Sequence, residues 1–125
     1  MNLTRIIRLA VLQTFFFMSF LAPAFAAMDL PEKLVPAGVY QGAKIIQVME
    51  SGTTSMAMVE VKATRDDVLE FYKQKLKQQG WKIAMQVEQE DSAVIHFTKD
   101  KMAIQVNVNQ SEDGLLQYQL IGLEQ

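Results

Sequence analysis

One segment of the sequence, residues 64–81, repeats its apolar side chains every three or four positions, whereas most of the chain after it alternates with a period of two. The three-to-four spacing stacks apolar side chains on one face of a helix. The residues that share this face are Val68, Leu69, Tyr72 and Leu76, with Phe71 at its edge. We therefore expect a single amphipathic helix.

Both ends of this helix carry boundary signals. Thr64 can accept hydrogen bonds from the free amides of the first turn, and Asp66 and Asp67 place negative charge at the positive end of the helix dipole. At the other end, Gly80 suits the left-handed position after the helix, which lets Trp81 fold back onto the last apolar turn. The sequence thus predicts where the helix begins and ends.

Runs of alternating residues predict two strands before the helix and four after it. Their ranges are 44–50, 56–62, 81–88, 93–99, 102–109 and 116–120. The links at 51–54, 100–101 and 111–114 are short enough for hairpins, although 100–101 lacks the usual glycine and also fits a longer loop. The order β-β-α-β-β-β-β predicts an α+β domain, with the helix packed on a mainly antiparallel sheet of about five or six strands.

Alternation also assigns a face to most strand residues. In the strand 81–88, the side expected to face the helix carries Trp81, Ile83, Met85 and Val87. The opposite, open side of the sheet is expected to carry uncharged polar and small apolar residues: Ala84, Gln86, Val94, His96, Thr98, Ala103, Gln105, Asn107, Gln117 and Gln119. Such groups lose less than charges when water is removed, which favours a contact surface, although an ordinary solvated face has the same composition.

The first 26 residues have the pattern of a signal peptide. Arg5 and Arg8 precede an apolar run at 9–22, and Ala24-Phe25-Ala26 supplies small residues at a cleavage site. The run is shorter than the roughly 20 residues that span a bilayer, so a retained membrane anchor is the weaker alternative. We expect cleavage after Ala26 and a periplasmic mature protein.

The segment 27–42 contains both prolines that lie outside the signal peptide, Pro31 and Pro36, together with Gly38 and Gly42. We expect it to be an extended lead-in that is not packed, followed by a single domain at 43–125.

Composition excludes several classes of function. The chain has no cysteine, which excludes disulfides, thiolate catalysis, zinc–cysteine sites and a lipoprotein anchor. Its formal net charge is −2, and it becomes −4 once the segment with Arg5 and Arg8 is removed. A negative domain is unsuited to general binding of nucleic acid or of anionic membranes.

Neither catalysis nor metal binding has a supported set of residues. His96 is the only histidine, and no nucleophile motif surrounds Ser92 or Ser111. A second set, Met49, Met56 and Met58 with His96, offers soft ligands that suit Cu(I). Methionines that flank a hairpin also simply fill hydrophobic gaps. We therefore assign no catalytic residue, cofactor or metal site from the sequence.

Two short stretches carry a resemblance to known proteins. Residues 39–44 (VYQGAK) and residues 71–81 (FYKQKLKQQGW) are similar to small exported bacterial domains of unknown function. Those domains have a YPGA-like lead-in, two strands, a helix ending FYxxxLxxxGW and a meander, and Gln41 stands where their pattern usually has proline. The resemblance implies the same fold and location, and it brings no activity with it.

The sequence therefore predicts a small non-enzymatic periplasmic module that binds a partner protein or a small ligand through its open sheet face. The candidate binding residues are His96, Gln105, Asn107, Gln117 and Gln119. Two alternatives remain. One is a carrier that holds an apolar ligand between helix and sheet, in a cavity lined by Tyr72, Leu76, Met85 and Phe97. The other, less favoured, is a hydrolase that uses His96.

Overall fold

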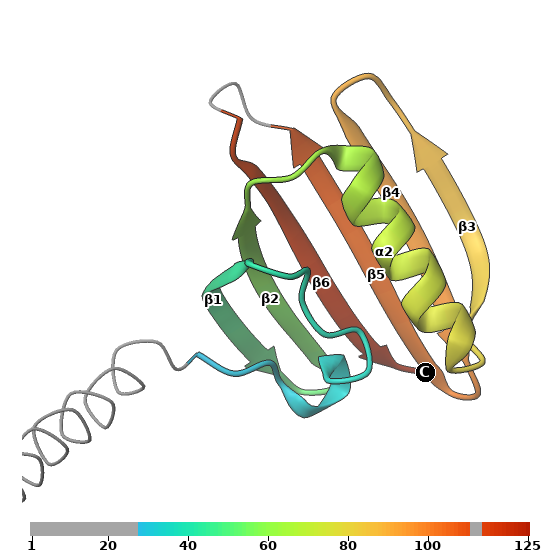
Figure 1. Cartoon of the computed structure of the whole chain (residues 1–125). Helices are drawn as coiled ribbons and strands as arrows, with labels where there is room; N and C mark the ends of the chain where they lie inside the picture. Colours follow the sequence, from blue (N-terminus) through green and yellow to red (C-terminus); the bar gives the residue numbers. More distant parts are fainter. Residues whose placement is uncertain (1–27, 111–113) are drawn as a thin grey trace, which may run out of the picture.

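A six-stranded antiparallel sheet with one long helix across it forms the domain in the computed structural model, which describes residues 28–110 and 114–125 (Figure 1). The elements are η2 (Glu32–Leu34), β1 (Lys44–Ser51), β2 (Thr54–Val61), α2 (Arg65–Gln78), β3 (Lys82–Glu88), β4 (Ser92–Lys99), β5 (Met102–Gln110) and β6 (Leu116–Glu124). The predicted α+β class and element order are confirmed. The expected signal peptide and the centre of the last turn lie outside the described residues.

The strands lie in the order β1-β2-β6-β5-β4-β3, so the last strand joins the first hairpin to the rest of the sheet. Two of the predicted links are tight turns, because Ser51 pairs with Thr54 and Lys99 pairs with Met102. Asp100 has a φ of 55°, the left-handed conformation that glycine usually provides in such a turn. The β1 and β3 strands form the two edges of the sheet.

The predicted boundaries of the helix are confirmed. The Thr64 side chain accepts a hydrogen bond from the Asp67 amide at 3.1 Å, as an N-cap residue does. At the other end, Gly80 has a φ of +92°, and the Trp81 amide donates to the Leu76 carbonyl at 3.0 Å. This bond closes a Schellman motif, in which glycine is favoured because it accepts a left-handed conformation without strain.

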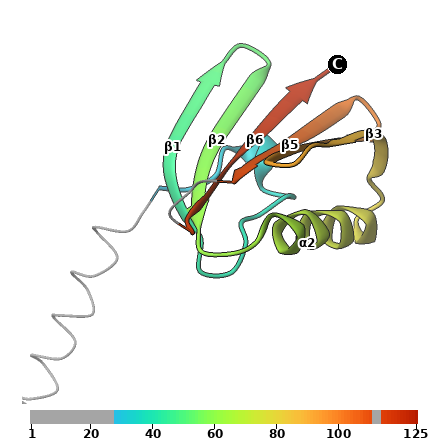
Figure 2. The ribbon, with the colours of Figure 1, turned by 90° about the horizontal axis from the view of Figure 1, so that it is seen from above.

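The helix packs on one face of the sheet, over β4 and β5. Its predicted stripe, which consists of Val68, Leu69, Tyr72 and Leu76, is buried. Figure 2 shows α2 and residues 28–42, here called the N-terminal segment, on the same side of the sheet. Within residues 28–110 and 114–125, no helix is long and apolar enough to cross a membrane.

The lead-in packs against the sheet, so the expectation of an unpacked segment is wrong for its central part. Leu34 and Ala37 are fully buried, and η2 contacts β2 and β6. The reason lies in Gly122, where an added Cβ would come within 3.1 Å of the Leu34 side chain. A glycine inside a strand permits this close approach, so η2 packs directly against the β6 backbone at Gly122.

The predicted faces of β3 are wrong beyond Ile83, because the pairing of β3 with β4 shifts by one residue there. Ile83 pairs with Phe97 on the helix side, but Met85 pairs with His96. The extra residue is a β-bulge, which moves every later side chain to the other face. Met85 and Val87 therefore lie on the open side, and Gln86, expected there, pairs with Ile95 on the helix side. Ala84, which was also expected on the open side, has no paired residue in β4 because it lies at the register shift.

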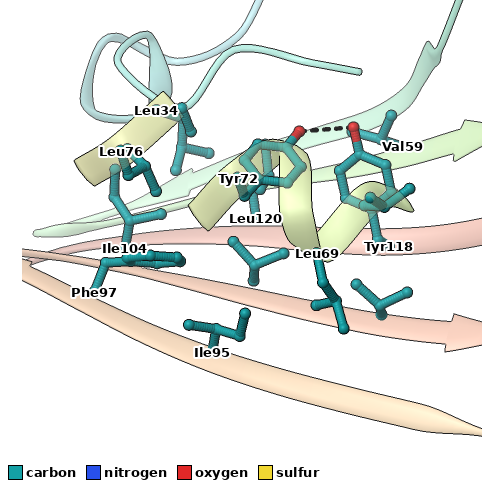
Figure 3. Close-up of a cluster of buried hydrophobic side chains, with 14 of the residues drawn as sticks. Leu34, Val59, Leu69, Tyr72, Leu76, Ile95, Phe97, Ile104, Tyr118 and Leu120 are labelled. Carbon is teal, nitrogen blue, oxygen red and sulfur yellow. Dashed lines mark hydrogen bonds between the residues drawn. The ribbon is translucent and has the colours of Figure 1, made fainter. Parts of the chain in front are cut away.

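Two tyrosine hydroxyls join three segments of the chain beneath the helix (Figure 3). The Tyr72 and Tyr118 oxygens lie 2.7 Å apart in the buried core. The Tyr72 hydroxyl donates to the Gly38 carbonyl at 2.9 Å, so the Tyr118 hydroxyl donates to Tyr72 and accepts from the Tyr40 amide at 3.1 Å. Both polar groups are thereby satisfied, and the N-terminal segment is fixed to α2 and β6.

Burial raises the pKa of Tyr72 and of Tyr118 above the ordinary value near 10, because the charged phenolate would lose its hydration. In the unfolded chain both groups lose their protons near pH 10, whereas in the folded chain they keep them. Their contribution to stability is therefore complete below about pH 10 and is lost as the pH rises above it.

We expect Tyr72 and Tyr118 to stay protonated in an ultraviolet titration until the chain unfolds in alkali. We also expect the variant Tyr72→Phe/Tyr118→Phe, checked for folding by circular dichroism, to lose less stability than the wild type between about pH 9 and 11. Ionisation of all three tyrosines while the fold stays intact would contradict the buried hydroxyl pair.

Candidate functional site

The face of the sheet turned away from α2 and η2, here called the open face, presents two rows of side chains that cross all six strands. One row, in sheet order, consists of Met49, Met56, Ile121, Gln105, His96 and Met85. The neighbouring row consists of Gln47, Met58, Gln119, Asn107, Val94 and Val87. The directly paired residues in such rows are the closest cross-strand neighbours in a sheet.

All five residues proposed from the sequence lie on this face. Gln105 pairs with His96, and Asn107 pairs with Gln119. Gln117 lies in the next row, where its amide nitrogen is 3.3 Å from a carboxylate oxygen of Glu60. The Gln105 amide donates to the Asn107 side-chain oxygen at 2.9 Å, so this pair of amides is oriented within the sheet surface.

Apolar side chains flank these central amides on both sides. Met49 and Met85, at opposite edges of the sheet, are each 50% exposed, and Val87 is 44% exposed. These three are the majority of the five large hydrophobic side chains that are exposed among the described residues. Their exposure is concentrated on one face, and an apolar surface that gathers in one place marks a contact site more often than scattered residues do.

The binding residues proposed from the sequence did not include these apolar side chains. Met56 and Met58 alternate with the buried residues of β2, so the pattern alone was sufficient to place them on the open face. Ile121 continues the alternation of β6, which runs to Glu124 and so beyond the predicted end at residue 120. Met49 and Met85 could not be placed in this way, because each follows a register shift in an edge strand.

The two rows contain no lysine, arginine, aspartate or glutamate. Charged groups appear only toward the ends of the strands, where Lys44 pairs with Glu60 and Lys82 pairs with Thr98. A neutral surface of amides and apolar groups loses less hydration energy when it is covered than a charged surface does. The geometry is suited to contact with groups that are apolar or that form neutral hydrogen bonds.

The strand pairing does not place the groups that hydrolysis requires directly opposite His96. Its direct cross-strand partners are Met85 and Gln105, which are neither nucleophiles nor acids. Ser92 lies four residues away on the same strand, at about 13 Å by the rise of a strand, and Ser111 falls outside the described residues. Across the part of the chain that the structure describes, no group of three histidine, aspartate or glutamate side chains could hold a metal ion.

The interior between helix and sheet is occupied by packed side chains. Tyr72, Leu76 and Phe97 are fully buried in one continuous core cluster, and Met85 lies on the opposite face of the sheet. The four residues predicted to line a carrier cavity therefore do not surround one common space. An open depression of about 410 Å³ lies elsewhere, beside Gln41 and the paired ends of β1 and β2.

A START domain-like family profile matches residues 45–114, from the beginning of β1 to the segment before β6. This match covers more than half of the chain. No curated protein and no solved structure gives a match. The extent of the match therefore places the molecule in a family, and this chain belongs to the START domain-like family.

Proposed function

We propose that this chain is a non-enzymatic binding module whose open face holds an amphipathic small ligand or the amphipathic surface of a partner protein. One observation carries the proposal: the central amides and the exposed apolar side chains lie in the same two uncharged rows. A START domain-like family is consistent with ligand binding.

The two kinds of side chain have different parts in such a contact. The methionine and valine flanks contribute affinity, because covering them removes apolar surface from water. Methionine is unbranched and flexible, so it adapts to partners of different shape. Gln105, Asn107 and Gln119 provide donors and acceptors at the centre, and these orient the bound molecule.

Two other functions find less support in the geometry. A carrier that holds its ligand beneath α2 would have to open a core in which Tyr72, Leu76 and Phe97 are fully buried. A hydrolase would need a nucleophile and an acid beside His96, where the register places Met85 and Gln105. The open face needs no such rearrangement.

We place this binding in the periplasm on the basis of the signal-peptide pattern in residues 1–26. The expected mature chain begins at Ala27. Intact-mass measurement on an osmotic-shock extract tests this expectation, and a mass that includes Met1 or Asn2 would contradict it.

The binding face is tested with the double variant Gln105→Lys/Gln119→Lys. The two lysines would have to lose water on contact, so binding to the open face should weaken by roughly tenfold or more. The probe is N-phenyl-1-naphthylamine, a neutral apolar fluorophore, titrated at matched protein concentration. Surface changes of this kind usually alter stability by no more than about 0.5 kcal/mol each, which thermal melts would verify.

The matched control is Gln74→Lys/Gln86→Lys, which adds the same charge to exposed positions on α2 and on the helix side of β3. This control should bind the probe as the wild type does. If both double variants bind equally well, or if only the control loses binding, the open face is not the binding surface.

A further inference from the structure

Three methionines lie on the open face of the β1–β2 hairpin. Met49 pairs directly with Met56, and Met58 follows two positions later on the same strand. Met49 is half exposed, and the other two are partly buried. A single hairpin, closed by a two-residue turn at Gly52 and Thr53, therefore carries all three side chains.

The register fixes the size of the triangle that their Cβ atoms form. Directly paired residues have Cβ atoms about 5 Å apart, and diagonal neighbours are about 7–8 Å apart. Residues two apart on one strand are separated by about 6.7 Å. Each sulfur lies two bonds beyond its Cβ on a side chain with three rotatable bonds, so three sulfurs can meet near the centre of such a triangle.

We infer that Met49, Met56 and Met58 form a binding site for a soft monovalent metal ion, Cu(I) or its analogue Ag(I). Thioether sulfur is a soft ligand, and it selects Cu(I) over the harder divalent ions that prefer imidazole or oxygen. The three side chains supply three ligands in one small area, which fits low-coordinate Cu(I).

The surroundings of the triad favour the same selectivity. Its neighbours on β6 are Gln119 and Ile121, which offer no imidazole, thiolate or carboxylate. The carboxylate next in register is that of Glu60, which lies beyond Met58 and is within hydrogen-bond distance of Gln117. A hard ion such as Zn²⁺ or Ca²⁺ would therefore find too few suitable ligands.

The structure separates His96 from this site. Three strand spacings lie between β2 and β4, a distance of about 14 Å. The set of three methionines with His96, considered from the sequence, thus divides into a methionine triad at one edge and a His96–Met85 pair near the other edge. The His96–Met85 pair supplies only two ligands, so a substitution of Met85 serves as the control for substitutions in the triad.

The test is a titration of the purified protein, labelled at its methionine methyl carbons, with Ag(I) and with Cu(I) under reducing, anaerobic conditions. At one equivalent, the methyl resonances of Met49, Met56 and Met58 should shift, and Zn²⁺ should leave them unchanged. Competition with a Cu(I) chelator gives the affinity. The variant Met56→Leu should weaken it by at least about tenfold, since even the loss of an outer-shell partner commonly costs that much.

Met85→Leu is the matched control and should bind metal as the wild type does. Met49→Leu offers a second ligand deletion in case Met56→Leu fails to fold. Unchanged methyl resonances, shifts confined to other methionines, or loss of binding in Met85→Leu but not in Met56→Leu would each overturn the assignment. The methyl shifts and the chelator competition report metal binding alone, so failure of the metal site can be distinguished from failure of the proposed contact role, which the lysine variants test.

Discussion

The buried contact between the Tyr72 and Tyr118 hydroxyls determines which face of the sheet is closed. It joins the middle of α2 to β6, and through Gly38 and Tyr40 it fixes the N-terminal segment to the same place. Buried hydroxyls must be paired, so this arrangement cannot loosen at one partner without leaving another unsatisfied. Both α2 and the N-terminal segment are thereby committed to one side.

The opposite face stays uncovered within the described chain, and the two edge strands determine what it presents. A register shift follows Ile45 in β1, and another follows Ile83 in β3. Each shift turns a methionine outward, Met49 at one edge and Met85 at the other. Bulges re-aim side chains at sheet edges, and here they place apolar groups on both sides of a row of amides. The result is a neutral, amphipathic surface on a sheet whose other face packs against α2 and η2.

The helix and the central strands could be predicted from the sequence because local signals and burial agree there. Thr64 and Gly80 fix the ends of α2, and regular alternation in β4, β5 and β6 places Gln105, Asn107 and Gln119 correctly on the open face. The edge strands could not be predicted in the same way. Alternation assumes an unbroken register, and nothing near Ala84 signals the extra residue that reverses the face of Met85.

The packing of the N-terminal segment could not be predicted for a different reason. Proline and glycine indicate that a regular strand or helix is interrupted, but they do not indicate that the chain leaves the surface. The signal lay at the other end of the sequence, in Gly122, whose missing side chain makes room for Leu34. Only the pairing of β6 with β2 and β5 brings these two residues together.

The central claim is that the sheet has one closed face and one open face, with its edge methionines on the open one. Methyl NMR with a neutral, soluble gadolinium chelate measures this directly, because relaxation of each methyl group reports its access to solvent. Strong enhancement at Met49 and Met85, with protection at Leu76 and Ile104, is the predicted result. Protection of Met85 equal to that of Leu76 would show that β3 has no bulge and that the open face is wrongly assigned.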